Sequence, residues 1–254
     1  MADFARRAVI ALGFAAIIPA RAQAPLRVLC STALQPAMGP IGAGFAQAQG
    51  SPAHVTFATT GAVLARLRAG EPFAVIIATR AALASLAGEG RVAAPSIIGI
   101  ATMAVGVAIR AGQPRPDIAT PEALRAALLG AGRIAYSDPA SGGTSGVHFA
   151  AIVERLGLTE ALRAKAVPVS GGGSVGEVVA RGEADLGIQM LSELRAVPGL
   201  DLLGALPDPL GNTTPLAAGL APGEPDAGAM AFLAFLRTPS AQDAMGASGL
   251  TVSM

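Results

Sequence analysis

The chain has little of the chemistry that nucleic-acid binding requires. Its 254 residues include 18 Lys and Arg against 17 Asp and Glu, a formal net charge of +1. Trp is absent and aromatic residues make up only 4%, so the chain offers neither a basic excess for phosphates nor platforms on which bases stack. We therefore expect no nucleic-acid partner. The hydrophobic content of 52% excludes a disordered chain and supplies ample core material.

Cysteine and histidine are equally scarce. Cys30 is the only cysteine, which excludes an intramolecular disulfide, and its place in the apolar run 26–30 predicts a buried strand thiol. His54 and His148 are the only histidines and stand far apart, with no ligand-spaced group of carboxylates. We expect no metal site. We also expect no cofactor, because the glycine-rich segments lack the Lys of a phosphate loop and the spacing of a dinucleotide fingerprint.

The first 24 residues have the pattern of a secretory signal. Arg6 and Arg7 precede an apolar run over 8–19, and Ala22-Gln23-Ala24 supplies small residues at the cleavage spacing. This predicts cleavage after Ala24 and a periplasmic protein, exported by the general rather than the twin-arginine route. The run is short for a membrane span, and no later stretch is long and uniform enough for one.

From residue 25 onward, short apolar runs alternate with helical patterns, which predicts an α/β fold. Expected strands are 26–30, 54–58, 73–78, 97–109, 134–136, 167–169, 186–189, 200–206 and 216–220. Expected helices are 33–49, 62–69, 81–87, 122–129, 147–156, 175–181, 226–237 and 238–245. The long run 97–109 is expected to leave one domain and enter another. The predicted division is therefore 25–105 plus 201–254 for the first lobe and 106–200 for the second.

Hydroxyl and glycine residues recur where a predicted strand meets the next helix. Ser31-Thr32 and Thr59-Thr60 mark two such joints, and 137–146 and 170–174 mark two more. The carboxyl ends of neighbouring strands form the ligand-binding edge of an open α/β sheet. Helix N-termini there suit an anion, although each hydroxyl also fits a simple helix cap. The recurrence favours an anion site shared by these joints.

The segments 137–143 (SDPASGG) and 182–188 (GEADLGI), with the opening 28–34 (VLCSTAL), Thr60-Gly61-Ala62 and 68–72 (RAGEP), resemble periplasmic solute-binding proteins related to the molybdate-binding family. The resemblance covers essentially the whole mature chain. It implies a type II periplasmic-binding-protein fold, in which two α/β lobes are joined by two crossover strands and a small anionic ligand lies in the cleft between them. It also implies an ABC-transporter permease as partner. We expect a monomer.

In that family neutral donors hold the anion: hydroxyls from two joints of the first lobe, backbone N–H groups from two helix starts of the second, and a tyrosine. Carried over, the hydroxyls match Ser31 and Thr60 or Thr59, and the backbone donors match the regions of Ala140-Ser141 and Ser174-Val175. The expected ligand-binding set is Ser31, Thr32, Thr59, Thr60, Ala140, Ser141, Gly142, Gly143, Thr144, Ser145, Gly173, Ser174, Val175 and Gln189.

Two departures point away from molybdate itself. The tyrosine position falls near Gln189-Met190, and the glycine runs at 142–143 and 171–173 suggest a roomier pocket. The chain also resembles aconitate isomerase, an enzyme on the same fold, which needs a group that moves a proton between carbons. Tyr136 and His148 are the catalytic candidates for that alternative, and Arg80 is a candidate partner for a carboxylate. Asp138 is expected to fix its turn.

Overall fold

The computed structural model describes residues 25–224 and 226–252. The predicted signal peptide, residues 1–24, lies outside the described residues. Strands and helices alternate through most of the chain. The strands are β1 Leu26–Ser31, β2 Ala53–Ala58, β3 Val75–Thr79, β4 Ile98–Arg110, β5 Ile134–Ser137, β6 Ala166–Val169, β7 Leu186–Met190, β8 Leu200–Ala205 and β9 Thr213–Leu220.

Ten α-helices and three short 3-10 turns are assigned among the described residues. The helices are α1 Gln35–Gln49, α2 Thr60–Arg68, α3 Arg80–Gly88, α4 Pro121–Gly130, α5 Thr144–Arg155, α6 Thr159–Arg163, α7 Val175–Ala180, α8 Leu191–Arg195, α9 Ala227–Phe235 and α10 Pro239–Ala247. The 3-10 turns are η1 Thr32–Leu34, η2 Ala94–Ser96 and η3 Pro139–Ser141.

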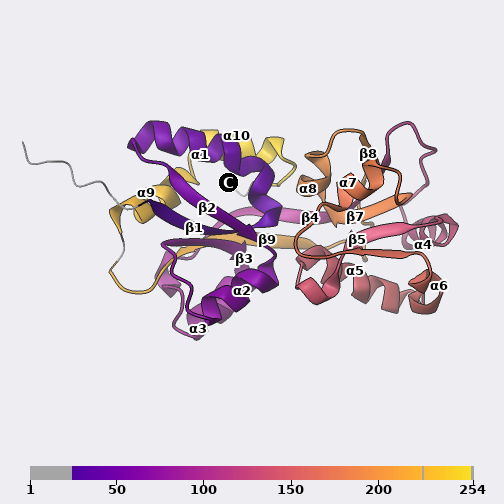
Figure 1. The fold of residues 1–254 in the computed structure, drawn as a ribbon, viewed down its shortest axis with the longest axis horizontal. Helices are drawn as coiled ribbons and strands as arrows, with labels where there is room; N and C mark the ends of the chain where they lie inside the picture. Colours follow the sequence, from indigo (N-terminus) through magenta and orange to yellow (C-terminus); the bar gives the residue numbers. More distant parts are fainter. Residues whose placement is uncertain (1–24, 225, 253–254) are drawn as a thin grey trace, which may run out of the picture.

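All strands join one mixed nine-stranded sheet, ordered β2-β1-β3-β9-β4-β7-β5-β6, with β8 paired to β4. The strand β4 passes between the two halves: residues 98–104 pair with β9, and residues 105–110 pair with β7 and β8. We call the half with β1, β2, β3 and β9 the first lobe, and the half with β5 to β8 the second lobe. Figure 1 shows the lobes side by side along the sheet.

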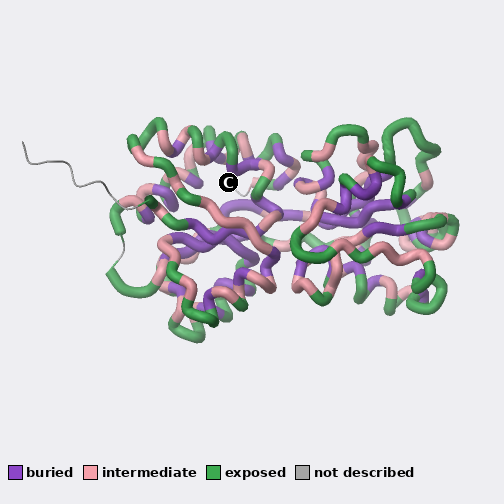
Figure 2. The backbone as a smooth tube through the Cα atoms, viewed as in Figure 1, coloured by how far each residue is buried: buried purple, intermediate pink, exposed green. Residues whose placement is uncertain are grey.

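Helices cover both faces of the sheet in each lobe (Figure 1). The strands in the middle of the molecule consist largely of buried residues, and the exposed residues lie on the outer turns and loops (Figure 2). On one face of the first lobe, the Phe45 ring packs edge-on against Phe232 and Phe235, with ring centroids 4.9 Å and 5.8 Å away. Cys30 is buried in β1, as the sequence predicts, and burial raises the pKa of its thiol.

The expected strands and helices are present, most within two residues of the predicted bounds, and the α/β prediction is confirmed. The sequence did not predict α6 or α8. The predicted division places residues 201–206 in the first lobe, but β8 pairs with Gly106–Arg110 in the second lobe. The chain returns through residues 206–212 instead. The boundary at 200/201 stays a prediction, and this pairing favours one nearer Ala205.

No helix among the described residues is long and apolar enough to cross a membrane.

Candidate functional site

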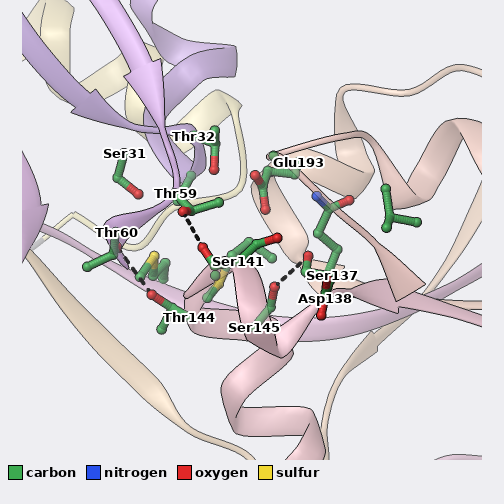
Figure 3. Close-up of a pocket in the computed structure, with 17 residues that line it drawn as sticks. Ser31, Thr32, Thr59, Thr60, Ser137, Asp138, Ser141, Thr144, Ser145 and Glu193 are labelled. Carbon is green, nitrogen blue, oxygen red and sulfur yellow. Dashed lines mark hydrogen bonds between the residues drawn. The ribbon is translucent and has the colours of Figure 1, made fainter. Parts of the chain in front are cut away.

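A narrow pocket, with a cavity volume of about 20 Å³, lies where the two lobes meet. Both lobes line it, mainly with small and hydroxyl-bearing side chains (Figure 3). The lining residues are Ser31, Thr32, Ala33, Thr59, Thr60, Met103, Ser137, Asp138, Ser141, Gly143, Thr144, Ser145, Val169, Gly172, Gln189, Met190 and Glu193.

The first lobe presents its hydroxyls where β1 and β2 end. Thr59 is the N-cap of α2, and its Oγ1 accepts a hydrogen bond from Ala62 N at 3.2 Å. Ser31 ends β1 and Thr32 begins the 3-10 turn that follows. Because β1 and β2 are parallel neighbours, their carboxyl ends lie together. The predicted meeting of these two joints is observed.

The second lobe contributes the start of α5. Its N-cap is Gly143, and no side chain within residues 25–224 and 226–252 caps this helix. First-turn N–H groups lack intrahelical acceptors and carry partial positive charge, so α5 begins at the pocket with its positive end. Ser145 Oγ donates to Ser137 Oγ at 3.1 Å, which links the helix to the end of β5.

Direct contacts hold the lobes together across the pocket. Thr59 Oγ1 donates to the Ser141 carbonyl oxygen at 2.7 Å, and Thr144 Oγ1 donates to Thr60 Oγ1 at 3.3 Å (Figure 3). Gly61 N donates to the Gly142 carbonyl oxygen at 3.0 Å. A Cβ on Gly61 would lie 2.8 Å from Gly142 Cα, so this closed arrangement requires glycine at position 61.

The charges of the pocket are unusual for an anion site. Among the described residues that line it, none is Lys, Arg or His, and two are acidic: Asp138 and Glu193. Asp138 stabilises its own loop, because Oδ1 accepts from Ala140 N at 2.9 Å and Oδ2 accepts from Ser170 Oγ at 2.8 Å. This confirms the expected turn-forming role of Asp138.

Glu193 is a pocket residue that the sequence did not reveal. It lies on α8, directly after β7, and its carboxyl points toward Thr32 and the space between the lobes (Figure 3). Burial raises the pKa of Glu193 from 4.5 to about 7, although hydrogen bonding from the Thr32 side chain and the Met190 backbone acts in the opposite direction. A carboxyl of this kind holds a proton near neutral pH.

The glycine loop at 170–174 reaches the pocket through Gly172 rather than through Gly173 or Ser174. Gln189 Oε1 accepts from Val175 N at 3.1 Å, which occupies that backbone donor. Ser174 Oγ accepts from Glu177 N at 3.2 Å and so caps α7. Val175 N and the Ser174 hydroxyl thus hold α7 in place, and Gln189 connects this helix to β7, while backbone donation near Ser174-Val175 to a ligand stays a prediction.

The backbone donors expected at Ala140-Ser141 are also used within their own loop. Ala140 N donates to the Asp138 side chain, and Ser141 N donates to the Asp138 carbonyl oxygen at 3.0 Å. Ala140 is exposed and outside the pocket lining, while Gly142 contacts Gly61 across the lobes. Of the predicted ligand set, Ser31, Thr32, Thr59, Thr60, Ser141, Gly143, Thr144, Ser145 and Gln189 line the pocket.

The two catalytic candidates and the candidate carboxylate partner all lie elsewhere. Tyr136 lines a separate hollow and packs against Phe149, with ring centroids 5.2 Å apart. Burial, with a smaller effect from Asp138, raises the pKa of its phenol. His148 Nε2 lies 2.9 Å from the Leu210 carbonyl oxygen, in the stretch between β8 and β9. Arg80 is exposed beside Gly99 of β4. None of these three residues lines the pocket between the lobes.

Strand geometry and helix length explain why Tyr136 lies away from the pocket and why Glu193 was not predicted. Successive strand residues point to opposite faces, so Ser137 facing the pocket turns Tyr136 away from it. For Glu193 the sequence offered an acidic residue four positions after Gln189, in a segment too short to predict as a helix. Within the described residues, no cluster of three or more His, Cys, Asp and Glu side chains is arranged to hold a metal ion.

Two α/β lobes with a pocket between them, joined along one mixed sheet, define a type II periplasmic-binding-protein fold. Residues 26–251 match the family of bacterial extracellular solute-binding proteins, and the chain belongs to this family.

A curated relative of this chain is aconitate isomerase from a Pseudomonas species. The two are 34% identical over 197 residues, which cover 76% of this chain and 72% of the relative.

Solved structures share the fold at lower identity. The periplasmic molybdate-binding protein of Azotobacter vinelandii superposes with a TM-score of 0.75 at 22% identity, covering 90% of this chain and 100% of that one. The sulfate-binding protein of Mycobacterium tuberculosis gives 0.69 at 19% identity, covering 89% and 86%. These likenesses support the predicted fold.

Proposed function

We propose that this chain is a periplasmic solute-binding protein that holds a small oxyanion or carboxylate between its lobes. The observation that carries the proposal is the hydroxyl-lined pocket, with the α2 and α5 N-termini beside it and direct hydrogen bonds across it. Neutral donors and helix N-termini hold a dehydrated anion through several charge-assisted hydrogen bonds. The sulfate- and molybdate-binding structures of the same fold support this ligand class.

The remaining parts of the proposal follow from the family. A soluble receptor outside the cytoplasm delivers its ligand to a membrane partner, so we propose export after cleavage near Ala24, a monomer in the periplasm, and an ABC-transporter permease as partner. Closure of the lobes around the ligand is the expected motion. The α5 N-terminus and the Thr144–Thr60 contact lie at the closing surface.

A thermal-shift panel tests the proposal. Molybdate, tungstate, sulfate, citrate, cis-aconitate and trans-aconitate are added in increasing concentration, and a true ligand raises the melting temperature with the logarithm of its concentration. Thr144→Val is expected to reduce the shift, because it removes a pocket hydroxyl. Thr120→Val is the matched control, since Thr120 only caps α4 through Ala123 N at 3.1 Å. If none of these anions raises the melting temperature, the proposal is contradicted.

An aconitate isomerase activity is the second candidate function. It is favoured by the Pseudomonas relative and by Glu193, whose carboxyl has a pKa suited to a general acid–base group. The reaction moves one proton from carbon to carbon while the double bond shifts, so it needs no oxidant or reductant. The described residues that line the pocket include no cationic side chain. Aconitate is a tricarboxylate with several negative charges that such side chains would balance, so the lining favours the binding function over the isomerase.

Proton NMR of each aconitate isomer with the purified protein distinguishes the two functions. If the chain is an isomerase, Glu193→Gln loses turnover while Tyr136→Phe and His148→Ala retain it, since the latter two side chains lie outside the pocket. Aconitate binding without interconversion by the wild-type protein excludes the enzyme and leaves the binding protein.

A further inference from the structure

Glu193 gives the cleft an acidic group beside the space that the proposed anion would occupy. The side chain lies partly buried on α8 and lines the pocket with the Thr32 side chain and the end of β7. In Figure 3 its carboxyl faces the hydroxyls of the opposite lobe. An anion bound among these hydroxyls would therefore lie close to the Glu193 carboxyl.

The charged groups around Glu193 do not neutralise it. Asp138 lies across the same pocket, and Glu177 of α7 shares with Glu193 the hollow on the outer side. Neither η1 nor α1 nor β7 contains a charged residue. The remaining charged side chains on elements packed against α8, and on α8 itself, are Arg110 of β4, Asp201 of β8 and Arg195.

Those three residues lie outside the pocket lining. Arg110 is exposed, with its guanidinium near Gly182. Asp201 accepts from Gly112 N at 3.1 Å, and Arg195 lies beside Gly249. Glu177 is exposed and lies 3.8 Å from Arg181. An ionised Glu193 would therefore face a bound anion without a cation in the pocket, which is unfavourable at short range and low dielectric.

We propose that Glu193 enters the complex as a neutral carboxylic acid that donates a hydrogen bond to the anion, so that binding is coupled to the uptake of one proton. The step is balanced: a proton from the buffer adds to one Glu193 oxygen when the anion binds and returns to the buffer when it leaves. The ligand class is a small oxyanion or carboxylate with an unprotonated oxygen as acceptor. This inference rests on the proposed anion binding and specifies its proton requirement.

In the anion-free protein the pKa of Glu193 is already about 7, because the carboxyl is removed from solvent. A negative charge beside it raises that pKa further, since the neutral form is then favoured. Linkage gives the direction: the complex binds more protons than the free protein, so affinity falls as pH rises above the free pKa, by about tenfold per pH unit.

Calorimetric titration of the whole mature chain tests this coupling. Molybdate, sulfate and trans-aconitate are titrated between about pH 6 and about pH 9, each in two buffers of different ionisation enthalpy. We expect wild-type affinity to fall steeply at alkaline pH, with about one proton taken up per anion there. In Glu193→Gln the amide still donates a hydrogen bond but does not titrate. We therefore expect no proton uptake at this site and a flatter profile.

Glu177→Gln is the matched control and should keep the wild-type slope, because its carboxyl is exposed outside the pocket. Binding with no proton uptake by the wild type, or an unchanged slope in Glu193→Gln, overturns the coupling and leaves anion binding in place. Absence of binding by all three anions at about pH 6 overturns the proposed function as well. If Glu193→Gln fails to fold by circular dichroism, the wild-type proton count decides alone.

Discussion

The Thr59 hydroxyl has two roles: it caps a helix and it forms a hydrogen bond between the lobes. Comparing its replacement with that of a threonine that only caps a helix separates the two roles. Its Oγ1 caps α2 and donates to the Ser141 carbonyl oxygen at 2.7 Å across the pocket. In Thr59→Val we expect a loss of about 1–2 kcal/mol from the cap. Anion affinity should also fall, because the closed form loses a hydrogen bond between lobes. Denaturant unfolding and calorimetry measure the two effects.

Thr79 provides the control for that experiment. It caps α3 through Ala82 N at 3.2 Å, in the same manner as Thr59, and lies outside the pocket lining. Thr79→Val should lose a similar amount of stability and keep the wild-type anion affinity. Equal affinities in the two variants would show that the hydroxyl of Thr59 contributes nothing to closure.

Glu193 should also make the anion-free protein's stability depend on pH. Its folded pKa of about 7 exceeds the ordinary value of 4.5, so the folded state binds more protons between these values. The resulting stability is fully present below about pH 4.5 and is lost as pH rises through about 7, by the order of 3 kcal/mol. Unfolding by urea at several pH values should show this loss in the wild type and its absence in Glu193→Gln.

Side-chain direction explains which single residues the sequence located. The joints at Ser31-Thr32 and Thr59-Thr60 were predictable, because parallel neighbours end at the same edge. Tyr136 was selected as the only tyrosine at a strand end, but strand alternation directs Ser137 to the pocket and Tyr136 to the hollow beside Phe149. Applying that alternation would have corrected the prediction.

At the scale of elements, the strands and most helices follow from hydrophobic periodicity, whereas α6 and α8 do not. Both contain five residues, which is too few for a helical period to stand out. Because α8 carries Glu193 into the pocket, the sequence did not identify this acidic residue as part of the site. The occupation of the backbone donors of Ala140, Ser141 and Val175 was likewise not predictable, since Gln189 reaches Val175 only through tertiary packing.

The position of α8 depends on Gly106 of β4. A Cβ on Gly106 would lie 2.6 Å from Leu191 Cγ and 2.7 Å from the Gly204 carbonyl oxygen. Gly106→Ala should therefore displace α8 and lower the free energy of unfolding by about 1–3 kcal/mol. The displacement should also shift the titration of Glu193, observable in the pH dependence of unfolding.

Gly99, on the same strand, is the matched control for Gly106. The Cβ of an alanine there would meet only the flexible end of the exposed Arg80 side chain. We expect Gly99→Ala to unfold within about 0.5 kcal/mol of the wild type. A similarly small effect for Gly106→Ala would contradict the role assigned to the close contact between β4 and α8.

For the whole molecule, the central question is how closely the lobes approach each other. Two crossings join the lobes, β4 and the stretch 206–212, and His148 of α5 contacts that stretch through the Leu210 carbonyl oxygen. Gly61 and Gly142 bring the backbones of the two lobes into direct contact. Because Gly61 lies in α2 and Gly142 follows η3, this contact depends on the relative position of the lobes and not on the folding of either one.

Gly61→Ala should therefore weaken anion binding without unfolding the protein. Its Cβ would lie 2.8 Å from Gly142 Cα, a backbone atom of the opposite lobe. We expect an affinity loss of about tenfold or more, equivalent to about 1.4 kcal/mol, measured by calorimetry. Gly39→Ala is the control: a Cβ on this α1 residue meets nothing within 4 Å, so affinity should stay and stability should rise by up to about 1 kcal/mol. Wild-type affinity in Gly61→Ala would mean that the anion binds without this degree of closure.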